Sequence, residues 1–344
     1  MNKKIVYRVN ADGKTGYGHL GRCISLSKFL EGEGYGAVFL LGPDQSGASV
    51  AFFRATDSTY QLPENYDEEA EIEAMKQIIN LENPSAAVVD LLESSLAMME
   101  TIYRSNIPLM AIDDICKNNH MADIIVNAGP VAREDDYKGR RPELLLGSDY
   151  LMLRPQFARM AQGRKDNEEP DGIYVSFGGS DPKNYTLRAL DMFGTIKNDF
   201  SAFIVVGSGY RNYDLLLDRA THSKVKADIR QNEKEPWRIM KWARVAVCSI
   251  GSTCWELMLM GVPCITLTQN DNQARYADEL AARGVVIHFA RNNEFNNDEL
   301  ANTIEKLMGN REMRRGMAEK GRKLVDGKGL ERVAKALIRK MKSV

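Results

Sequence analysis

The stretch that decides the fold is IVYRVNADGKTGYGHLGRCISLSKFL, residues Ile5 to Leu30. Its first residues are rich in β-branched side chains and predict a buried strand, and its last part has apolar residues at helical spacing. Three glycines between them, Gly13, Gly16 and Gly18, predict a loop with little side chain, so that a ligand can approach the backbone closely. The order strand, glycine-rich loop and helix is typical of the α/β class.

His19 follows this loop directly and falls in the predicted first turn of the helix. The positive end of the helix dipole disfavours a charged imidazole there, so a neutral, basic ring is expected. We therefore take His19 as the candidate catalytic residue. The alternative is a tight turn without chemistry, because GKTGYG matches neither the dinucleotide fingerprint nor a P-loop.

The composition indicates an ordinary globular protein. The chain has 344 residues, of which 44% are hydrophobic and 27% charged, and a length of this size predicts about two domains. Its net charge of −1 provides no field for nucleic acid, and no apolar run approaches the ~20 residues of a membrane span. The start of the chain lacks the apolar core of a signal peptide, which favours a cytoplasmic location. The five cysteines form no CxxC pair and are expected to be buried free thiols.

The first half of the chain alternates short apolar runs with helical patterns. Strands are predicted at 37–41, 86–89, 109–112 and 123–126, and a helix at 64–80. The last three strands end at Asp90, Asp113 and Asn127. Parallel sheets bind ligands at the carboxyl ends of their strands, so these side chains are expected to edge one crevice. The alternative for each is a helix cap or an Asx turn.

The second half repeats the pattern after a polar segment, 159–171, which we interpret as a linker. Its predicted strands are 173–177, 202–206, 245–248, 262–267 and 285–289. The sequence therefore predicts two Rossmann-like domains, residues 1–158 and 172–326, that face each other across a cleft. The basic segment 327–344 is predicted as a C-terminal helix.

That C-terminal helix carries an apolar stripe of Leu330, Val333, Leu337 and Met341 among many lysines and arginines. The stripe is expected to pack against the protein and leave a solvated basic face. The alternative is a peripheral contact with an anionic membrane surface.

Two glycine turns in the second half are of the kind that hold phosphates, GGSDP at 178–182 and GST at 251–253. Each follows a predicted strand and precedes a helix, whose N-terminal amides attract anions. Glu256 lies one turn into the second helix, where it could bind a ribose, and Asn272 and Gln273 follow the next strand. Together they predict a site for a nucleoside diphosphate. An N-cap turn is the alternative for GGSDP. No Asp-x-Asp metal motif is present, so neither a metal nor another cofactor is expected.

Several motifs carry a resemblance that covers nearly the whole chain. They are RVNADGKTGYGHLGRC at 8–23, IDD at 112–114, VNAGPVAREDDY at 126–137, LGSDYLMLRPQF at 146–157, SFGGSDPKN at 176–184, GSTCWELMLMGVP at 251–263 and DNQ at 271–273. In these motifs the chain resembles the hydrolases of UDP-2,4-diacetamido-2,4,6-trideoxy-β-L-altropyranose, which belong to pseudaminic acid biosynthesis. That family is similar in turn to the two-domain, inverting UDP-sugar transferases of the peptidoglycan type.

The resemblance implies a glycosyltransferase B fold, in which the C-terminal domain binds UDP and the N-terminal domain binds the sugar. It also implies attack of water at the anomeric carbon with inversion, His19 as general base, and no metal. The substrate-binding residues expected from all these patterns are Gly16, Gly18, Arg22, Asp90, Asp113, Asn127, Gly178, Gly179, Ser180, Gly251, Ser252, Thr253, Glu256, Asn272 and Gln273.

The chain departs from the family at two places. Leu91 and Leu92 stand where the family has His-Tyr, and Asn10 replaces a common Asp. Two alternatives therefore stay open: a glycosyltransferase with a lipid or glycan acceptor, and a nucleotide-sugar-binding protein without activity. The sequence does not give the oligomeric state.

Overall fold

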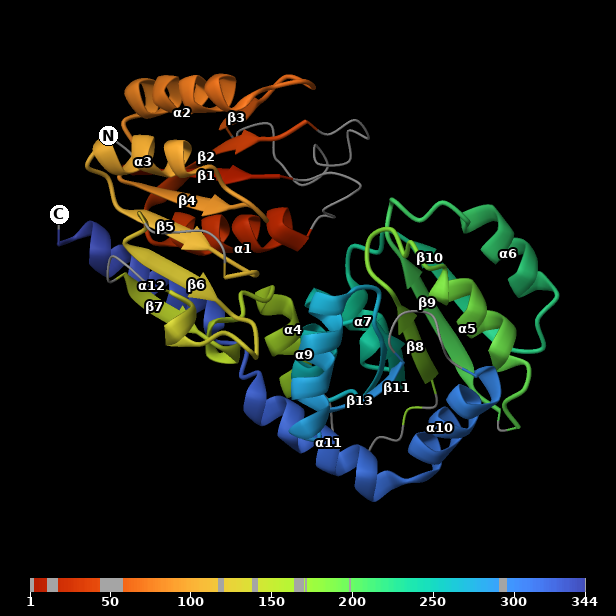
Figure 1. Cartoon of the computed structure of the whole chain (residues 1–344). Coiled ribbons are helices and arrows are strands. Elements are labelled where there is room, and N and C mark those ends of the chain that lie inside the picture. The colour runs from red at the N-terminus through yellow and green to blue at the C-terminus, as the bar shows by residue number, and fades with distance from the viewer. Residues whose placement is uncertain are drawn as a thin grey trace. The chain divides into compact units, whose positions relative to one another are not determined.

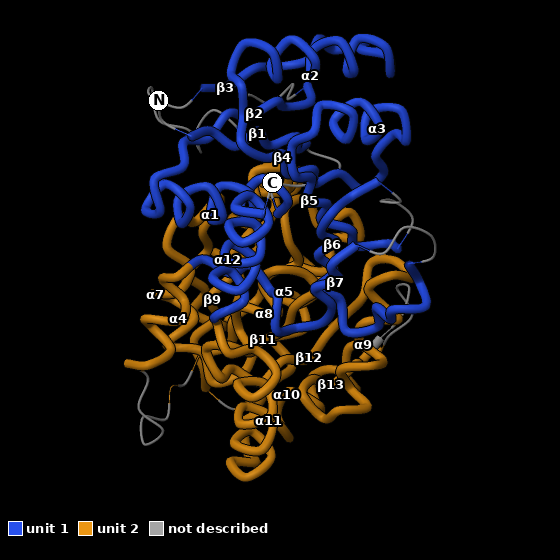
Figure 2. The backbone as a smooth tube through the Cα atoms, turned by 90° about the vertical axis from the view of Figure 1, so that its left-hand side faces the viewer, with its two compact units in different colours: residues 1–154, 328–344 blue, residues 155–327 orange. Residues whose placement is uncertain are grey.

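The computed structural model describes residues 3–10, 18–43, 58–116, 121–137, 142–163, 170, 172–197, 199–290 and 296–343. The chain divides into two compact units, which are coloured separately in Figure 2. Unit 1 contains Met1–Arg154 together with Lys328–Val344, and unit 2 contains Pro155–Gly327. The C-terminal segment, predicted as a separate element, is thus part of unit 1.

Unit 1 is built on a parallel sheet whose seven described strands have the order β3-β2-β1-β4-β5-β6-β7. The strands are β1 (Lys3–Val9), β2 (Tyr35–Leu41), β3 (Ser58–Gln61), β4 (Ala86–Asp90), β5 (Leu109–Ile112), β6 (Ile124–Asn127) and β7 (Glu143–Leu146). The helical segments are α1 (Gly18–Gly32), α2 (Glu68–Glu82), α3 (Leu96–Arg104), η2 (Glu134–Asp136), η3 (Ser148–Tyr150) and α12 (Gly329–Met341). The strand order reverses between β1 and β4, and ligands of such sheets bind at the carboxyl ends of the strands beside this point.

Alternation of side chains along β1 separates two apolar layers. Tyr7 faces α1 and α12 and stacks on Phe39, with ring centroids 4.9 Å apart, whereas Val6 faces α2 and α3. Figure 1 shows these helix pairs on opposite faces of the sheet. Leu330 and Val333 of α12 are buried in the first layer, so the apolar stripe of the C-terminal helix packs against the protein, as we expected.

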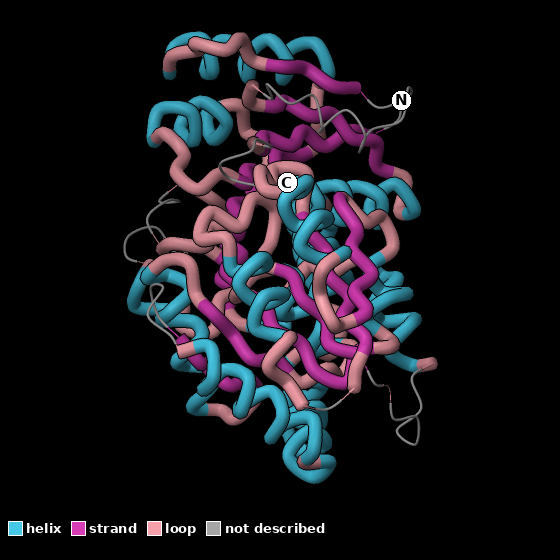
Figure 3. Tube along the Cα trace, turned by 90° about the vertical axis from the view of Figure 1, so that its right-hand side faces the viewer, coloured by secondary structure: helices cyan, strands magenta, loops and turns pink. Residues whose placement is uncertain are grey.

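Unit 2 contains a second parallel sheet, whose six described strands have the order β10-β9-β8-β11-β12-β13. The strands are β8 (Gly172–Ser176), β9 (Ser201–Val206), β10 (Lys226–Gln231), β11 (Ala243–Cys248), β12 (Cys264–Leu267) and β13 (Val286–Ala290). The helices are α4 (Pro155–Gln162), α5 (Tyr185–Phe193), α6 (Tyr213–Thr221), α7 (Pro236–Met240), α8 (Ser252–Leu259), α9 (Asp271–Ala282), α10 (Asn297–Gly309) and α11 (Arg311–Leu324). Figure 3 shows the strands flanked by helices, and the predicted α/β class with two Rossmann-like sheets is confirmed.

Two features of the fold were not predicted. The expected linker at 159–171 was wrong in its first part, because α4 continues to Gln162 and buries Phe157 against Trp237. The strands β3, β7 and β10 were missed. All three are edge strands, and an edge strand needs no continuous apolar run because one side of it faces solvent. None of the helices among the described residues is long and apolar enough to span a bilayer.

Candidate active site

The ring of His19 lies at the carboxyl edge of the unit 1 sheet, beside the reversal of strand order. His19 is the second residue of α1, and its Nδ1 lies 2.6 Å from Oδ1 of Asp90. Asp90 ends β4 and is fully buried, whereas 18% of the His19 side chain is exposed. The register brings them together, because Asp90 lies opposite Val9, the last residue of β1.

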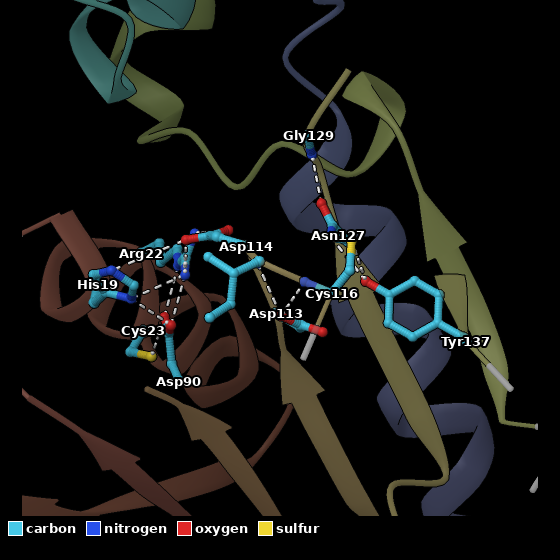
Figure 4. A network of polar contacts seen from close by, with 11 residues as sticks. His19, Arg22, Cys23, Asp90, Asp113, Asp114, Cys116, Asn127, Gly129 and Tyr137 are labelled. Atoms are coloured by element: carbon cyan, nitrogen blue, oxygen red, sulfur yellow. Dashed lines mark hydrogen bonds and ion pairs between the residues drawn. The ribbon is translucent and has the colours of Figure 1, made fainter. Parts of the chain in front are cut away.

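Arg22 lies one turn after His19 on α1 and binds the same carboxylate (Figure 4). Its Nε donates to Asp90 Oδ2 and its Nη2 donates to Oδ1, both at 2.6 Å. Its Nη1 and Nη2 also donate to the two carboxylate oxygens of Asp114, at 3.0 and 2.9 Å. Arg22 therefore joins the ends of two strands, since Asp90 ends β4 and Asp114 follows β5.

These contacts set the charges of the site. Burial raises the pKa of Asp90, but the charges of Arg22 and His19 outweigh burial and hold that pKa well below its ordinary value. Burial likewise lowers the pKa of Arg22, and the carboxylates of Asp114 and Asp90 raise it above its ordinary value. The site therefore contains a permanent carboxylate and a permanent guanidinium at neutral pH.

The contacts of His19 also determine which ring nitrogen carries the proton. An ionised carboxylate only accepts hydrogen bonds, so the contact with Asp90 places a proton on Nδ1. Arg22 Nη2 lies 3.0 Å from the same nitrogen, but this group has carboxylate oxygens at 2.6 and 2.9 Å as acceptors. When the ring is neutral, its lone pair lies on Nε2, which is 3.9 Å from Asp114 Oδ2, beyond hydrogen-bond distance. A nitrogen in this state can accept a proton from a reacting group.

Cys23 is a further contact of Asp90 that the sequence reasoning counted only as a core residue. Its Sγ donates to Asp90 Oδ2 at 3.4 Å. Burial and the charge of Asp90 raise the pKa of the Cys23 thiol, so it stays protonated and can donate. Cys23 ends the motif at 8–23, but the motif did not identify it as a contact of Asp90.

The two aspartates after β5, Asp113 and Asp114, have different contacts. Asp114 is the one that lies beside His19 and Arg22. Asp113, the predicted site residue, is buried, and its Oδ1 accepts from the backbone amides of Ile115 and Cys116. This is the Asx-turn alternative that the sequence left open. The sequence shows two adjacent aspartates at the end of this strand. It does not show which of the two side chains turns toward α1.

Asn127, at the end of β6, organises a second group of side chains (Figure 4). Its Oδ1 accepts from the amide of Gly129, and its Nδ2 donates to the Tyr137 hydroxyl at 2.8 Å and to Cys116 Sγ at 3.4 Å. Burial raises the pKa of Tyr137 well above its ordinary value, so this residue remains a neutral phenol. The sequence reasoning missed Cys116 and Tyr137, which come from loops on either side of β6.

The remaining unit 1 predictions fall around the glycine loop. Gly18 is the first residue of α1 and is exposed, whereas Gly16 lies outside the described residues. Asn10 accepts at 2.7 Å from Nη1 of the buried Arg8. Of the two leucines that replace the family's His-Tyr after Asp90, Leu91 is buried and Leu92 is 49% exposed.

In unit 2, the GGSDP turn supplies its own helix cap. Both oxygens of the buried Asp181 accept backbone amides at the start of α5, from Tyr185 at 3.0 Å and Thr186 at 2.8 Å. Asp181, which lies before the N-cap Asn184, therefore takes the capping role that the alternative gave this turn. An added anion would find these two amides taken. Gly178 and Gly179 are exposed and Ser180 is partly buried in the turn before it.

The GST turn differs, because the N-cap of α8 is Gly251, which has no side chain to cap the helix. Gly251 and Ser252 are exposed and Thr253 is partly exposed. Backbone amides at such a terminus bind anions. Glu256, one turn along α8, is 7% exposed.

The DNQ motif opens α9, which Asn270 caps by accepting from the amide of Gln273 at 2.9 Å. Gln273 in turn accepts from the amide of Gln269, whose side chain donates to the carbonyl of Phe177 at 2.8 Å. The side chain of Gln269 thus ties the loop after β12 to the residue that follows β8, whereas Gln273 binds within the loop. Asn272 is exposed.

Comparison with solved structures shows that the chain has the glycosyltransferase B fold. MurG from Acinetobacter baumannii aligns over 98% of this chain and 99% of its own, with a TM-score of 0.71 and 15% identity. Spinosyn rhamnosyltransferase SpnG aligns over 99% of this chain and 100% of its own, with a TM-score of 0.67 and 14% identity. SpnG has also been solved with thymidine diphosphate. No protein-family profile matches the chain.

Three curated proteins are similar to parts of this sequence. The Bacillus subtilis spore coat polysaccharide biosynthesis protein SpsG is 27% identical over 64% of this chain and 66% of its own length. The uncharacterized Methanocaldococcus jannaschii protein MJ1062 is 26% identical over 80% of this chain and 58% of its own. The chain thus spans less than two thirds of the length of these two relatives.

The third relative is the UDP-2,4-diacetamido-2,4,6-trideoxy-β-L-altropyranose hydrolase of Campylobacter jejuni. It is 23% identical over 83% of this chain and 99% of its own length. The resemblance named from the motifs is confirmed, because this relative carries that name. Together the comparisons show the fold, and they do not separate hydrolysis from transfer.

Proposed function

We propose that this chain hydrolyses a UDP-linked 2,4-diacetamido-2,4,6-trideoxyhexose to UDP and the free sugar, with inversion at the anomeric carbon. The observation that supports it best is the contact between His19 and Asp90 at the strand reversal of unit 1, which leaves the ring lone pair on Nε2. The similarity to the Campylobacter hydrolase over nearly its whole length supports the choice of substrate class.

In this mechanism His19 Nε2 takes a proton from water as the water oxygen bonds to the anomeric carbon. The bond from that carbon to the diphosphate oxygen breaks, and UDP leaves with the electron pair. Asp90 accepts from Nδ1 throughout and stabilises the imidazolium that forms, as in other carboxylate–histidine pairs. The diphosphate is a competent leaving group, so one base together with donors set against the phosphates is sufficient.

We assign nucleotide binding to unit 2. The uncapped N-terminus of α8 at Gly251–Thr253 offers amides and hydroxyls to the diphosphate, and Glu256 is the proposed ribose contact. The proposal uses no metal or other cofactor. Asp113 and Asn127 shape the sugar side through the loop backbone and Tyr137.

Transfer to an acceptor is the second candidate, and one observation favours it. Two large apolar side chains follow Asp90 closely in the chain and face solvent: Leu92 is 49% exposed and Leu96 is 60% exposed. An apolar acceptor could cover them, and the structural neighbour SpnG is named as a transferase. In that case His19 would take the proton of an acceptor hydroxyl instead of water.

The test incubates the purified protein with the diacetamido donor alone and with lipid or glycan acceptors. Hydrolysis predicts UDP release without acceptor, and proton NMR of the freshly released sugar shows the inverted anomer. His19→Ala should abolish release, whereas His222→Ala, at an exposed histidine of unit 2, should not. UDP release that requires an acceptor would favour transfer, and activity that survives in His19→Ala would overturn the mechanism.

A further inference from the structure

Three cysteines of unit 2 meet in its interior, although their spacing in the sequence matches no metal motif. Cys248 ends β11, Cys264 begins β12 and Cys254 lies in the first turn of α8. Their sulfur atoms all lie within 4.8 Å of one another, and all three residues are fully buried.

The parallel register explains the meeting. Ala246 of β11 pairs with Cys264 of β12, so Cys248, two residues further on, faces the same side of the sheet. Val245 and Val247, which alternate with these residues along β11, face the opposite layer, with α5 and α10. Helix α8 contacts β11 and β12. Its residue Cys254 therefore lies beside the thiols of Cys248 and Cys264.

The chemistry of the group is that of a thiolate ligand set. Three thiols that lie within 4.8 Å of one another can offer three sulfur ligands to one ion. A metal that binds three sulfurs at about 2.3 Å in one plane holds them about 4 Å apart, which this group reaches with little movement.

We propose that Cys248, Cys254 and Cys264 bind one thiophilic metal ion, of which Zn²⁺ and Cu⁺ are the biological examples. Sulfur ligands select such ions over Mg²⁺ or Ca²⁺. Each coordinating thiol releases one proton as its metal–sulfur bond forms, so a metal held by all three releases three protons to solvent. The ion is structural, since its three ligands lie at 0% exposure.

The placement gives the site a consequence. Cys248 and Cys254 bracket residues 249–253, which contain the GST turn at the start of α8. A bound ion would tie both ends of this turn, and on the proposed function it would hold the diphosphate-binding amides in place. This part rests on the proposed function, whereas metal binding itself does not.

The first experiment strips the full-length protein with a chelator under reducing conditions and adds Zn²⁺, Cu⁺ or, as a spectroscopic probe, Co²⁺. We expect about one equivalent after desalting, with thiolate-to-cobalt charge transfer in the Co²⁺ sample. Cys248→Ala, Cys254→Ala and Cys264→Ala should each lose the ion, and Cys116→Ala should keep it. Metal content in the wild type no higher than in the cluster variants would overturn the proposal.

A second measurement keeps the test valid if a cluster variant fails to fold. In the wild-type protein, alkylation followed by peptide mass spectrometry reports each thiol separately. At metal ten times above its Kd, alkylation of the three cluster thiols through the open state should slow by about tenfold, and that of Cys116 should not. Equal alkylation with and without metal would also overturn the site. Separately, UDP binding measured with and without metal tests the link to the turn, and a failure there alone would leave the metal site standing.

Discussion

The substitution Asp90→Asn tests the centre of the proposed site with the smallest change of shape. Three charged or polar donors converge at 2.6 Å on the two oxygens of Asp90: Nε and Nη2 of Arg22 and Nδ1 of His19. An asparagine offers one acceptor and one donor group. Whichever way its amide turns, an NH₂ group faces an N–H group of Arg22 or His19.

The structure sets the size of the effect. Removing one partner of a buried ion pair costs about 3–5 kcal/mol. Here Arg22 keeps two hydrogen bonds to Asp114 and has 20% of its side chain exposed. We therefore expect Asp90→Asn to lower the free energy of unfolding by about 3 kcal/mol, at the low end of that range. Loss of the Nδ1 acceptor should lower kcat by about a hundred- to ten-thousand-fold, as expected for a misoriented base.

Urea unfolding measures the first effect and UDP release at saturating donor measures the second. The matched control is Asp228→Asn, because Asp228 accepts two hydrogen bonds from Arg230 in the same two-pronged way, but on the surface. Surface pairs contribute about 1 kcal/mol or less, and this control should leave kcat unchanged. A destabilised Asp90→Asn protein with wild-type kcat would show that the pair is structural and would refute the role given to His19.

The pH dependence of stability gives an independent check. The pKa of Asp90 is lower in the folded state than its ordinary value of 3.8. The unfolded chain therefore binds more protons there, and the stabilisation by the carboxylate is complete above that value and is lost as the pH falls through the folded-state pKa. The difference in unfolding free energy between wild type and Asp90→Asn should stay constant from about pH 5 to 7 and narrow below about pH 4. A gap that widens at acid pH would contradict the assigned charge.

Four further substitutions test the packing of the two units by urea unfolding. Glu71→Ala leaves the guanidinium of the fully buried Arg8 without its carboxylate and should lower the free energy of unfolding by about 3–5 kcal/mol. Glu100→Ala breaks an exposed ion pair within a helix and should lower it by about 0.5 kcal/mol or less. Equal losses in the two variants would refute the argument from burial. Gly207→Ala places a Cβ atom 2.4 Å from the carbonyl oxygen of Gly179. This substitution should lower the free energy of unfolding by about 1–3 kcal/mol. An unchanged urea midpoint would show that the turns of Gly207 and Gly179 are not in contact. Gly316→Ala should instead stabilise the protein by about 0.5–1 kcal/mol, because Gly316 lies inside α11 and the new Cβ has nothing within 4 Å. A lower stability of this variant would show that the new Cβ meets a neighbouring group.

The parts of the site that the sequence predicted are those governed by local pattern and by the parallel sheet. The β-branched run before the glycine loop and the apolar spacing after it place His19 at a helix start beside the carboxyl edge. Because neighbouring parallel strands end at one edge, a polar residue that ends a buried run, such as Asp90, had to come near that helix. Arg22 then follows from helical spacing, since residues three apart share a face.

The parts that could not be predicted depend on contacts between distant segments. Arg8 and Glu71 form a buried ion pair 63 residues apart, and nothing in either local pattern shows it. The choice between Asp113 and Asp114 depends on the path of one loop after β5. Likewise the meeting of Cys248 and Cys264 depends on the register between β11 and β12, which is a property of the assembled sheet.

The two glycine turns of unit 2, alike in sequence, must act differently on an anion. At α5 the carboxylate of Asp181 already accepts the amides of Tyr185 and Thr186. Burial raises the pKa of Asp181, and its hydrogen bonds with those residues work against that rise. Any phosphate contact there must therefore come from the exposed turn at 178–180 and not from the helix terminus.

At α8 the situation is reversed, because Gly251 leaves the helix terminus without a side-chain cap. An anion at this terminus gains both the amides and the favourable end of the helix dipole without displacing a protein carboxylate. The strands that precede the two turns are neighbours, with Ser176 opposite Cys248 at their ends. One diphosphate could thus take its helix-terminal contacts at Gly251–Thr253 and its turn contacts at 178–180, which is the arrangement that the proposed function requires of unit 2.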